Sequence, residues 1–443
     1  MSSHRLITVL LLVPNLAVAW VSSPDARAES AAKLVGSAVH PPLYTVNLDE
    51  PPETRWNHIA KAYKSQVPAV QDYLNSVVPK WALPLVEGAA SNLVGYFREY
   101  GTEMQAMAKV WGVSPGLLVV MNLIMQVEEI GLNCSNWNVT GPTHKDDPGC
   151  EIIDPKQEWC YCKAAHHAGA ITRDDGYVSI FRRTAAFPVE EQQDGPRGMC
   201  TSVVAQAADG TIALGRNLDW NLPPSVRGII IDIDFVKGGK KIFRGTGAAG
   251  AMGVFNGMAY ASGAANTTTG AWTGTIDARG KGGKLLVNIF QALLAHSLTP
   301  CHHLRMVLES ARDFESAVTG LSKTPQIDEN YFIVAGTKRA EGAVIARGRE
   351  KAADVWRLDP SEPTGWYRLQ TNYDHWDPVP TADDRRHPGY KLMNDLTAAR
   401  VAPASMWGVI TTYPVFNSHT DFSLVSVPSL GLYNATTWMG GAH

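Results

Sequence analysis

The segment that most constrains this chain is a strand-turn-strand pattern that opens on a cysteine. Cys200 leads into a short β-prone run, and residues 215–220 (GRNLDW) end the second strand. A turn at residues 208–210 (ADG) brings the second strand back beside the first as a hairpin. We therefore expect Arg216 and Asp219 to lie close to Cys200.

A cut between Met199 and Cys200 would give Cys200 two reactive groups, a thiol and a free α-amine. The thiolate is the reacting form of cysteine, and it needs a neighbouring base. An α-amine titrates near ~8 when unperturbed, so one residue can supply both the nucleophile and the base. The alternative is an inert core cysteine, which is the usual role of a lone cysteine in an apolar strand.

Further motifs follow in order along the chain. They are KTP at 323–325, YFIV at 331–334, EGAVI at 341–345, TNYDHW at 371–376 and DDRR at 383–386. Together with the Cys200 motif they resemble the family of acid ceramidase and N-acylethanolamine-hydrolysing acid amidase, which are N-terminal-nucleophile hydrolases. Several separate motifs in one order are far more specific than a single tetrapeptide. The resemblance covers most of the chain from about Pro41 onward.

The resemblance implies an α+β fold, an αββα sandwich preceded by a helical small subunit. The residue pattern agrees in outline, with apolar positions at helical spacing through residues 29–132 and strand patterns dominating from Cys200 onward. We expect a strand over 228–235, a hairpin joining 331–335 to 343–346, and helices over 286–295 and 303–321.

The expected divisions are a signal peptide at 1–28, a helical propeptide or alpha subunit at 29–199, and a catalytic beta subunit at 200–443. Residues 6–19 form an apolar run after a short basic start, too short for a comfortable membrane span, and small residues precede a cleavage after Ala28. An uncleaved anchor is the alternative. A secretory route predicts a lysosome or another acidic compartment, or secretion.

The resemblance also implies roles for individual residues. Cys200 is the nucleophile, Arg216 holds a substrate oxygen or orients the amine, and Asp219 accepts a hydrogen bond from the α-ammonium. Asn372 matches an oxyanion-hole asparagine, and Arg385 matches a further functional arginine. Each of the last four residues also has a purely structural alternative. Arg216 is then a strand arginine paired with a carboxylate, and Asp219 a turn aspartate. Asn372 is then an Asx-turn asparagine, and Arg385 a structural arginine.

One triplet departs from the family pattern. Residues 277–279 read Asp-Ala-Arg, where family members carry a glutamate in the middle. We expect Asp277 to take over part of that role, in binding the substrate or in processing. His375 resembles the N-acylethanolamine amidase pattern more than the ceramidase pattern, but the choice between the two substrates stays open.

A cysteine-rich insertion at about 133–197 also departs from the family. Cys134, Cys150, Cys160 and Cys162 crowd into it, and a secretory route makes them disulfide candidates of undetermined connectivity. A zinc site is the weaker rival, because Cys-x-Cys is not the usual zinc spacing. We expect no metal and no cofactor. The insertion either shields the site before the cut or is a surface excursion.

Glycosylation acceptor tripeptides begin at four asparagines: Asn133, Asn138, Asn266 and Asn434. In a secreted chain these tripeptides predict exposed loops.

The sequence therefore predicts an autoprocessed amidase that hydrolyses fatty-acid amides, N-acylethanolamine or ceramide, to a fatty acid and an amine. An acyltransferase of the same fold and a non-catalytic lipid-binding glycoprotein are the alternatives. The expected partners are the lipid amide, the second self-cleaved subunit of a heterodimer, and a peripheral membrane or lipid-presenting protein. The net charge of −3, without a basic patch interleaved with aromatic residues, excludes a nucleic-acid partner.

Overall fold

The computed structural model describes residues 37–77, 83–128, 150–154, 159–162, 181–182, 200–220, 222–261, 270–279, 297–380 and 383–440. The signal peptide, Met199, Cys134, Asn133, Asn138, Asn266 and the helix expected at 286–295 lie outside these residues.

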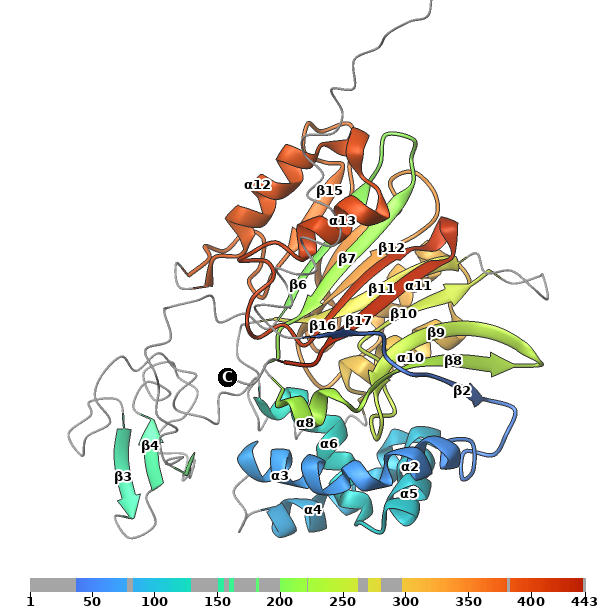
Figure 1. Ribbon diagram of the computed structural model, residues 1–443, viewed down its shortest axis with the longest axis vertical. Coiled ribbons are helices and arrows are strands. Elements are labelled where there is room, and N and C mark those ends of the chain that lie inside the picture. The colour runs from blue at the N-terminus through green and yellow to red at the C-terminus, as the bar shows by residue number, and fades with distance from the viewer. Residues whose placement is uncertain are drawn as a thin grey trace, which may run out of the picture.

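Two large sheets form the centre of the molecule (Figure 1). The first has six strands in the order β1 (Ala38–Val39), β17 (Leu432–Trp438), β16 (Phe422–Val427), β7 (Ile212–Leu218), β6 (Cys200–Gln206) and β15 (Tyr367–Gln370). The second has eight, in the order β14 (Ala352–Arg357), β13 (Gly342–Arg347), β12 (Asn330–Ala335), β11 (Gly270–Ala278), β10 (Asn256–Tyr260), β9 (Lys240–Ala248), β8 (Ile230–Lys237) and β2 (Leu43–Asn47).

Helices cover the outer face of each sheet. On the six-stranded sheet these are α12 (Arg386–Leu396) and α13 (Pro403–Ile410), and on the eight-stranded sheet α10 (Pro300–Ser310) and α11 (Phe314–Lys323). The two sheets face each other through β6 and β7 on one side and β11 and β12 on the other. The fold is therefore the expected αββα sandwich, with all seven residues of β6 and of β7 buried between its layers.

Several local predictions are confirmed. The β6–β7 hairpin turns where expected, with Gly210 at a positive φ of 97° that glycine adopts without strain. The strand at 228–235 and the hairpin at 331–346 correspond to β8 and to β12–β13. The helix expected at 303–321 is two helices, because Asp313 caps the start of α11 through the Ser316 backbone N–H.

The N-terminal segment contains the predicted helices (Figure 1, bottom). They are α2 (Asn57–Tyr63), η1 (Lys64–Gln66), α3 (Val67–Val77), α4 (Leu83–Ser91), η2 (Val94–Phe97), α5 (Glu99–Trp111) and α6 (Pro115–Glu128). In α5 the buried Met104, Met107, Ala108 and Trp111 recur at helical spacing, and Gly112 ends the helix in the left-handed conformation.

This segment also contributes strands, which the mainly helical prediction missed. β1 pairs antiparallel with β17, and β2 runs parallel to β8, so the segment supplies an edge strand to each large sheet. Both strands are short and largely exposed, and their partners lie far along the chain, so local sequence carries little signal for them.

A buried ion network joins the N-terminal segment to the rest of the chain. Glu103 of α5 accepts two hydrogen bonds from Arg305 of α10, at 2.6 and 2.8 Å, and one from Arg55 at 2.6 Å. Nearby, Asn122 of α6 bonds the Gly250 carbonyl and the Met252 backbone N–H. Burying three charges together costs little only when they are paired and hydrogen-bonded, as they are here.

A small separate sheet follows, of β3 (Cys150–Asp154), β4 (Trp159–Cys162) and β5 (Phe181–Arg182). Its register sets Cys150 opposite Cys162. Asn434 does not lie in an exposed loop, as its acceptor tripeptide had suggested. It is a partly buried residue of β17, and Ala435 and Thr436 beside it are buried, because β17 pairs with β16 inside the six-stranded sheet. Among the described residues, no helix is long and apolar enough to span a bilayer.

Candidate active site

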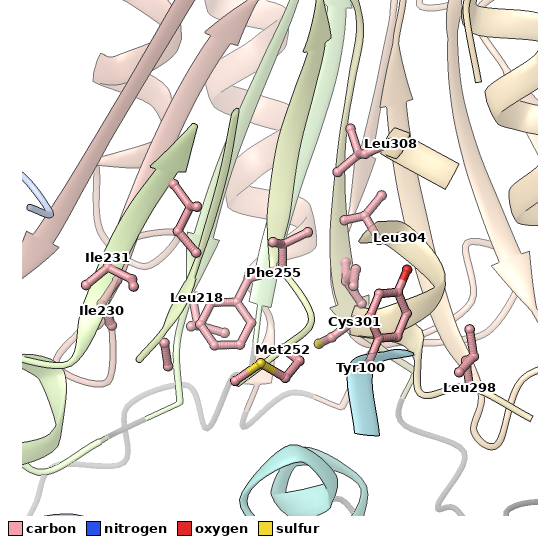
Figure 2. Close-up of a cluster of buried hydrophobic side chains, with 14 of the residues drawn as sticks. Tyr100, Leu218, Ile230, Ile231, Met252, Phe255, Leu298, Cys301, Leu304 and Leu308 are labelled. Atoms are coloured by element: carbon pink, nitrogen blue, oxygen red, sulfur yellow. The ribbon is translucent and has the colours of Figure 1, made fainter. Parts of the chain in front are cut away.

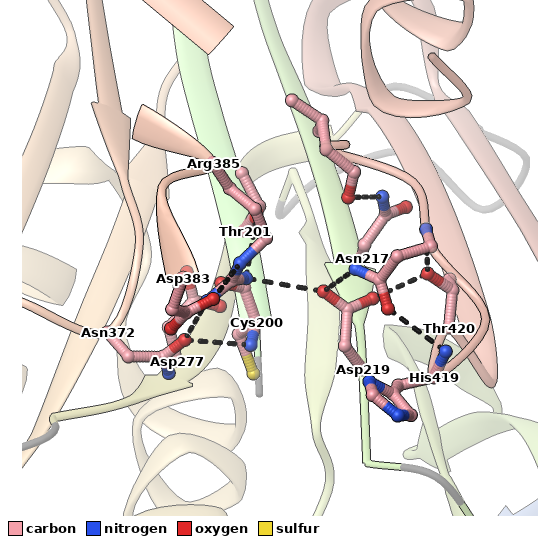
Figure 3. Close-up of polar contacts among 12 residues, drawn as sticks. Cys200, Thr201, Asn217, Asp219, Asp277, Asn372, Asp383, Arg385, His419 and Thr420 are labelled. Carbon is pink, nitrogen blue, oxygen red and sulfur yellow. Dashed lines mark hydrogen bonds and ion pairs between the residues drawn. The ribbon is translucent and has the colours of Figure 1, made fainter. Parts of the chain in front are cut away.

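Cys200 begins β6 at the centre of a buried polar group (Figure 3). Its sulfur lies 3.7 Å from Nη2 of Arg216, and its backbone N–H donates to Oδ1 of Asn372 at 3.1 Å. The chain is continuous here, so this nitrogen is a peptide nitrogen that becomes the α-amine only after a cut. The fold brings together six predicted site residues, namely Cys200, Arg216, Asp219, Asp277, Asn372 and Arg385.

Arg216 reaches the thiol because of the hairpin register. It lies opposite Ser202 in the β6–β7 pairing and is fully buried between the sheets. Its guanidinium donates to the Ile276 carbonyl at 3.0 Å and to Oδ1 of Asn256 at 3.5 Å. A cation so close to the sulfur stabilises a thiolate.

Arg385 has a more central position than its sequence context suggested. It directly precedes α12, is fully buried, and donates to the Cys200 carbonyl, to Oδ1 of Asn372 at 2.7 Å and to Oδ2 of Asp219 at 3.3 Å. Asp383 accepts its Nε at 2.9 Å. Arg385 therefore links the reacting residue to both neighbouring polar side chains.

Asn372 presents its amide oxygen, not its amide nitrogen, to Cys200. Its Nδ2 donates to the Ala278 carbonyl at 2.9 Å, while Oδ1 accepts from Cys200 and Arg385. In the uncleaved chain Asn372 thus orients the nitrogen of Cys200. The oxyanion role expected for Nδ2 stays a prediction for the cleaved enzyme.

Asp219 is held by two residues that the sequence analysis did not identify. Thr420 donates to its Oδ1 at 2.6 Å and Asn417 to its Oδ2 at 3.2 Å (Figure 3). Asp421 of the same loop accepts the backbone N–H groups of Trp220 and Leu222, which fixes the segment after Asp219. Asn417 and Thr420 lie in a polar run that reads as a turn, and nothing local marks them as site residues.

Burial shifts the pKa values of two acids in this group. Removal from water raises the pKa of the Cys200 thiol to about 12, helped by the charge of Asp277 and opposed by Arg216. Burial likewise raises the pKa of Asp277 to about 7, against the lowering effect of Arg216 and of the Ser202 hydroxyl, which donates at 2.8 Å. The uncleaved chain thus holds a neutral thiol next to an acid that is protonated below neutral pH.

An apolar pocket lies between the N-terminal helices and the sheets. Leu74 and Met121 line it from α3 and α6, and Trp220, Phe255 and Cys301 from the catalytic part. Figure 2 shows Phe255 and Cys301 in the adjoining apolar cluster. In the sequence, Trp220 directly follows Asp219, and Phe255 directly precedes Asn256, whose side chain contacts Arg216. His375 instead stacks on Trp356, with ring centroids 4.2 Å apart.

Within the described ranges, no cluster of three or more histidine, cysteine, aspartate or glutamate side chains could hold a metal ion. The site residues themselves offer a buried thiol, two arginines, two carboxyls and an amide. An αββα sandwich with such a cysteine at the first position of an inner strand defines an N-terminal-nucleophile hydrolase.

Comparisons with known proteins agree with that class. A family model described as the beta subunit of N-acylethanolamine-hydrolyzing acid amidase matches residues 39–97. The N-acylethanolamine-hydrolyzing acid amidase of Rattus norvegicus is 30% identical over 389 residues, which are 87% of this chain and 85% of that protein. Acid ceramidase of Rattus norvegicus is 25% identical, over 86% of this chain and 82% of that protein.

A solved structure of the Caenorhabditis elegans N-acylethanolamine-hydrolyzing acid amidase ortholog aligns with 53% of this chain and 94% of that chain, at 33% identity and a TM-score of 0.46. By its sequence relatives, the chain belongs to the family of N-acylethanolamine-hydrolyzing acid amidase and acid ceramidase.

Proposed function

We propose that this protein cuts its own chain between Met199 and Cys200 and then hydrolyses the amide bond of a fatty-acid amide. The observation that carries the proposal is the buried group around Cys200. Its thiol faces the Arg216 guanidinium, its nitrogen is held by Asn372 and its carbonyl by Arg385. These side chains thus hold in place the thiol, the nitrogen and the carbonyl of Cys200, and an N-terminal nucleophile uses the first as the attacking group and the second as the base.

In the first reaction the Cys200 sulfur attacks the Met199 carbonyl carbon. The C–N bond breaks as a thioester forms, and the departing nitrogen takes up a proton to become the α-amine. Asp277 is our proposed proton carrier: its pKa of about 7 leaves it protonated at acidic pH, so it gives its proton to the nitrogen and takes up the proton that the thiol loses. Water then hydrolyses the thioester, which releases the Met199 carboxylate and restores the thiol.

In the second reaction the α-amine takes the thiol proton, and the sulfur attacks the acyl carbonyl of the substrate. Arg216 stabilises the thiolate, Asp219 holds the amine in place, and Arg385 holds the Cys200 carbonyl. The substrate amine leaves with the proton, and water releases the fatty acid from the thioester. After the cut, Asn372 could turn its Nδ2 toward the oxyanion, a kind of contact whose loss costs about 10²–10³ in rate.

The apolar pocket supports an acyl chain as the part of the substrate that is recognised. Each buried CH₂ contributes about 0.8 kcal/mol, so long-chain amides should react better than short ones. Of the two headgroups we favour N-acylethanolamine, because the amidase relative is more similar than the ceramidase relative. The intact polar group argues against a non-catalytic lipid carrier. The family's acid enzymes and the signal-peptide pattern support an acidic compartment of the secretory route.

Two matched variants test the proposal. Cys200→Ala should remain uncut when the purified protein is held at acidic pH, whereas Cys301→Ala, a second buried cysteine, should still yield a fragment that begins at Cys200. N-terminal sequencing identifies the cut. Release of fatty acid from palmitoyl and acetyl ethanolamides and from ceramide, measured across pH, then defines the substrate. An intact chain that hydrolyses amides would overturn self-processing, and equal rates on acetyl and palmitoyl amides would overturn the lipid-amidase assignment.

A further inference from the structure

A chain of hydrogen bonds leads away from Arg216 between the two sheets. Nη1 of Arg216 donates to Oδ1 of Asn256 at 3.5 Å, and Nδ2 of Asn256 donates to the Tyr433 hydroxyl. That hydroxyl lies 2.8 Å from Oγ1 of Thr246, which donates to Oδ1 of Asp232 at 2.6 Å. Arg216, Asn256 and Thr246 are fully buried, and Asp232 nearly so.

The direction of several bonds in this relay is fixed by its end groups. A guanidinium can only donate, so Asn256 accepts with its oxygen and donates with its nitrogen, and above pH ~6, where Asp232 is ionised, Thr246 donates to that carboxylate. The Tyr433 hydroxyl has two acceptors within reach, Oγ1 of Thr246 at 2.8 Å and the Asn256 backbone carbonyl at 3.3 Å. Connected hydrogen bonds of this kind strengthen one another by polarisation.

The relay also joins the two sheets. Arg216 and Tyr433 come from β7 and β17 of the six-stranded sheet, whereas Asn256, Thr246 and Asp232 come from β10, β9 and β8 of the other. In this relay the Tyr433 hydroxyl bonds both Asn256 and Thr246 of the eight-stranded sheet. This hydroxyl therefore sets the position of the Asn256 amide.

Arg216 needs such an anchor because a second partner competes for it. Its Nε lies 3.8 Å from Oδ1 of Asp277, and neither that nitrogen nor the other oxygen of Asp277 has a hydrogen bond among the described residues. Where Asp277 is ionised, a small rotation of the guanidinium would close a two-bond ion pair with its carboxylate, and where it is protonated the same rotation would still allow Nε to donate to it. That rotation would also move Nη2 away from the Cys200 sulfur.

We propose that Asn256 and Tyr433 are positioning residues that hold the Arg216 guanidinium at the Cys200 thiol and away from Asp277. The proposal rests on the assignment of Cys200 as the nucleophile. Neither residue touches the reacting atoms, and both act through Arg216.

The far end of the relay lies at the junction with the N-terminal segment. Asp232 pairs in register with Leu43 of β2, and its backbone N–H donates to the Pro42 carbonyl. The polar and titratable groups that act on its carboxyl are Thr246, Arg244, Asp234, Tyr433 and His40. The relay therefore connects the nucleophile to the strand that the N-terminal segment adds to the sheet.

Tyr433→Phe removes the central hydroxyl and is the test variant. Tyr367→Phe is the matched control, since the Tyr367 hydroxyl bonds to Asn394 of α12 and not to the relay. On self-cleaved protein we expect Tyr433→Phe to lower kcat for a long-chain amide roughly five- to tenfold, the scale of one lost hydrogen bond, with KM unchanged. The control should match wild type in both constants.

The reaction of Cys200 with iodoacetamide gives a readout independent of amide hydrolysis. In a Cys301→Ala background, the pH at which Cys200 reacts should move upward in Tyr433→Phe, because the cation that favours the thiolate is displaced. Thr246→Val breaks the next link and should shift the profile in the same direction, and Thr246→Ser should restore it. Wild-type profiles and wild-type kcat in both Tyr433→Phe and Thr246→Val would overturn the proposal. If the wild-type protein hydrolyses no amide while Tyr433→Phe and Thr246→Val still shift the iodoacetamide profile, the amidase function is refuted and the positioning role of the relay stands.

Discussion

Two buried arginines, Arg305 and Arg385, carry dense hydrogen-bond networks in different parts of the molecule. Arg305 holds Glu103 with two bonds, donates to the Met252 carbonyl at 2.7 Å and lies over the rings of Tyr100 and Phe235. Arg385 holds the Cys200 carbonyl, Asn372 and Asp219. The first joins the two segments that a cut before Cys200 would create, and the second surrounds the point of the cut.

The difference lies in the partners. Those of Arg305 are groups that no reaction changes, so its bonds stabilise the junction before and after the cut. Those of Arg385 include atoms of the reacting residue itself. Although the two arginines are similarly buried and both charged, we therefore expect different consequences of mutation: a loss of folding stability at Arg305 and a loss of reaction rate at Arg385.

The largest expected effect concerns the junction. In an uncleaved Cys200→Ala background, Glu103→Gln should lower the free energy of unfolding by about 3 kcal/mol, because it removes the fully buried carboxylate that Arg305 and Arg55 share and leaves them only the less buried Glu309 and Glu99. Denaturant titration measures the loss. Glu315→Gln, which breaks an exposed pair with Arg357, is the control and should cost less than about 1 kcal/mol. Equal losses in the two variants would show that the buried network around Glu103 stabilises the fold no more than an exposed ion pair does.

The second effect concerns the cut. Arg385→Lys keeps a positive charge but cannot reach the Cys200 carbonyl, Asn372 and Asp219 together. We expect self-cleavage to slow about 10²–10³-fold, as for loss of a donor aimed at the reacting atoms. The control Arg347→Lys changes an equally buried arginine that bonds the Ser322 and Thr324 carbonyls. Gel analysis over time gives both rates, and fast cleavage in Arg385→Lys would contradict the catalytic assignment.

A third prediction uses pH. The pKa of Asp277 is raised from 3.8 to about 7 in the folded protein, so its contribution to stability is complete below pH ~4 and is lost as pH rises toward 7. In uncleaved Cys200→Ala protein, Asp277 should account for roughly 2 kcal/mol of the unfolding free energy lost between pH 5 and 7, at about 1.4 kcal/mol per unit. Urea titrations at both values measure the loss. Asp277→Asn in that background should reduce the loss by about that amount, while other buried carboxyls such as Asp421, whose pKa burial raises to about 8, continue to contribute. An unchanged loss would show that Asp277 is not one of its sources.

The smallest effect concerns Thr420. Thr420→Val removes the 2.6 Å hydrogen bond to Asp219 while keeping the shape of the side chain. A hydrogen bond to a charged group is worth about 1.5 kcal/mol or more, so amide hydrolysis should slow about tenfold. Thr412→Val, whose hydroxyl bonds only a helical carbonyl, serves as the control. Similar steady-state rates in both variants would mean that Thr420 does not position Asp219.

Much of the architecture could be predicted because its signals are local. The Asp209-Gly210 turn and the hydrophobic spacing in α5 each depend on a few consecutive residues. β1 and β2 could not be predicted this way, since β1 pairs with a strand almost 400 residues away and β2 shows no clean alternation.

The residues of the candidate site also divide into those whose proximity follows from local sequence and those that only tertiary pairing brings together. Cys200, Arg216 and Asp219 share one hairpin, so their proximity follows from the turn. Asn417, Thr420 and Tyr433 reach the site only because β16 pairs with β7 and β17 with β16, tertiary pairings that no nearby residue indicates. Family motifs identified Asn372 and Arg385, but not that Arg385 bonds the nucleophile's own carbonyl.

The two edge strands from the N-terminal segment have a thermodynamic consequence. Before a cut at Cys200 the molecule can refold as one chain. After it, each large sheet contains strands from two polypeptides, β1 and β2 from one and their partners from the other. Refolding then becomes bimolecular and slows with dilution, so loss of the native state is in practice irreversible. After the cut, the protein is stable kinetically: its lifetime depends on its unfolding rate rather than on the equilibrium between folded and unfolded states.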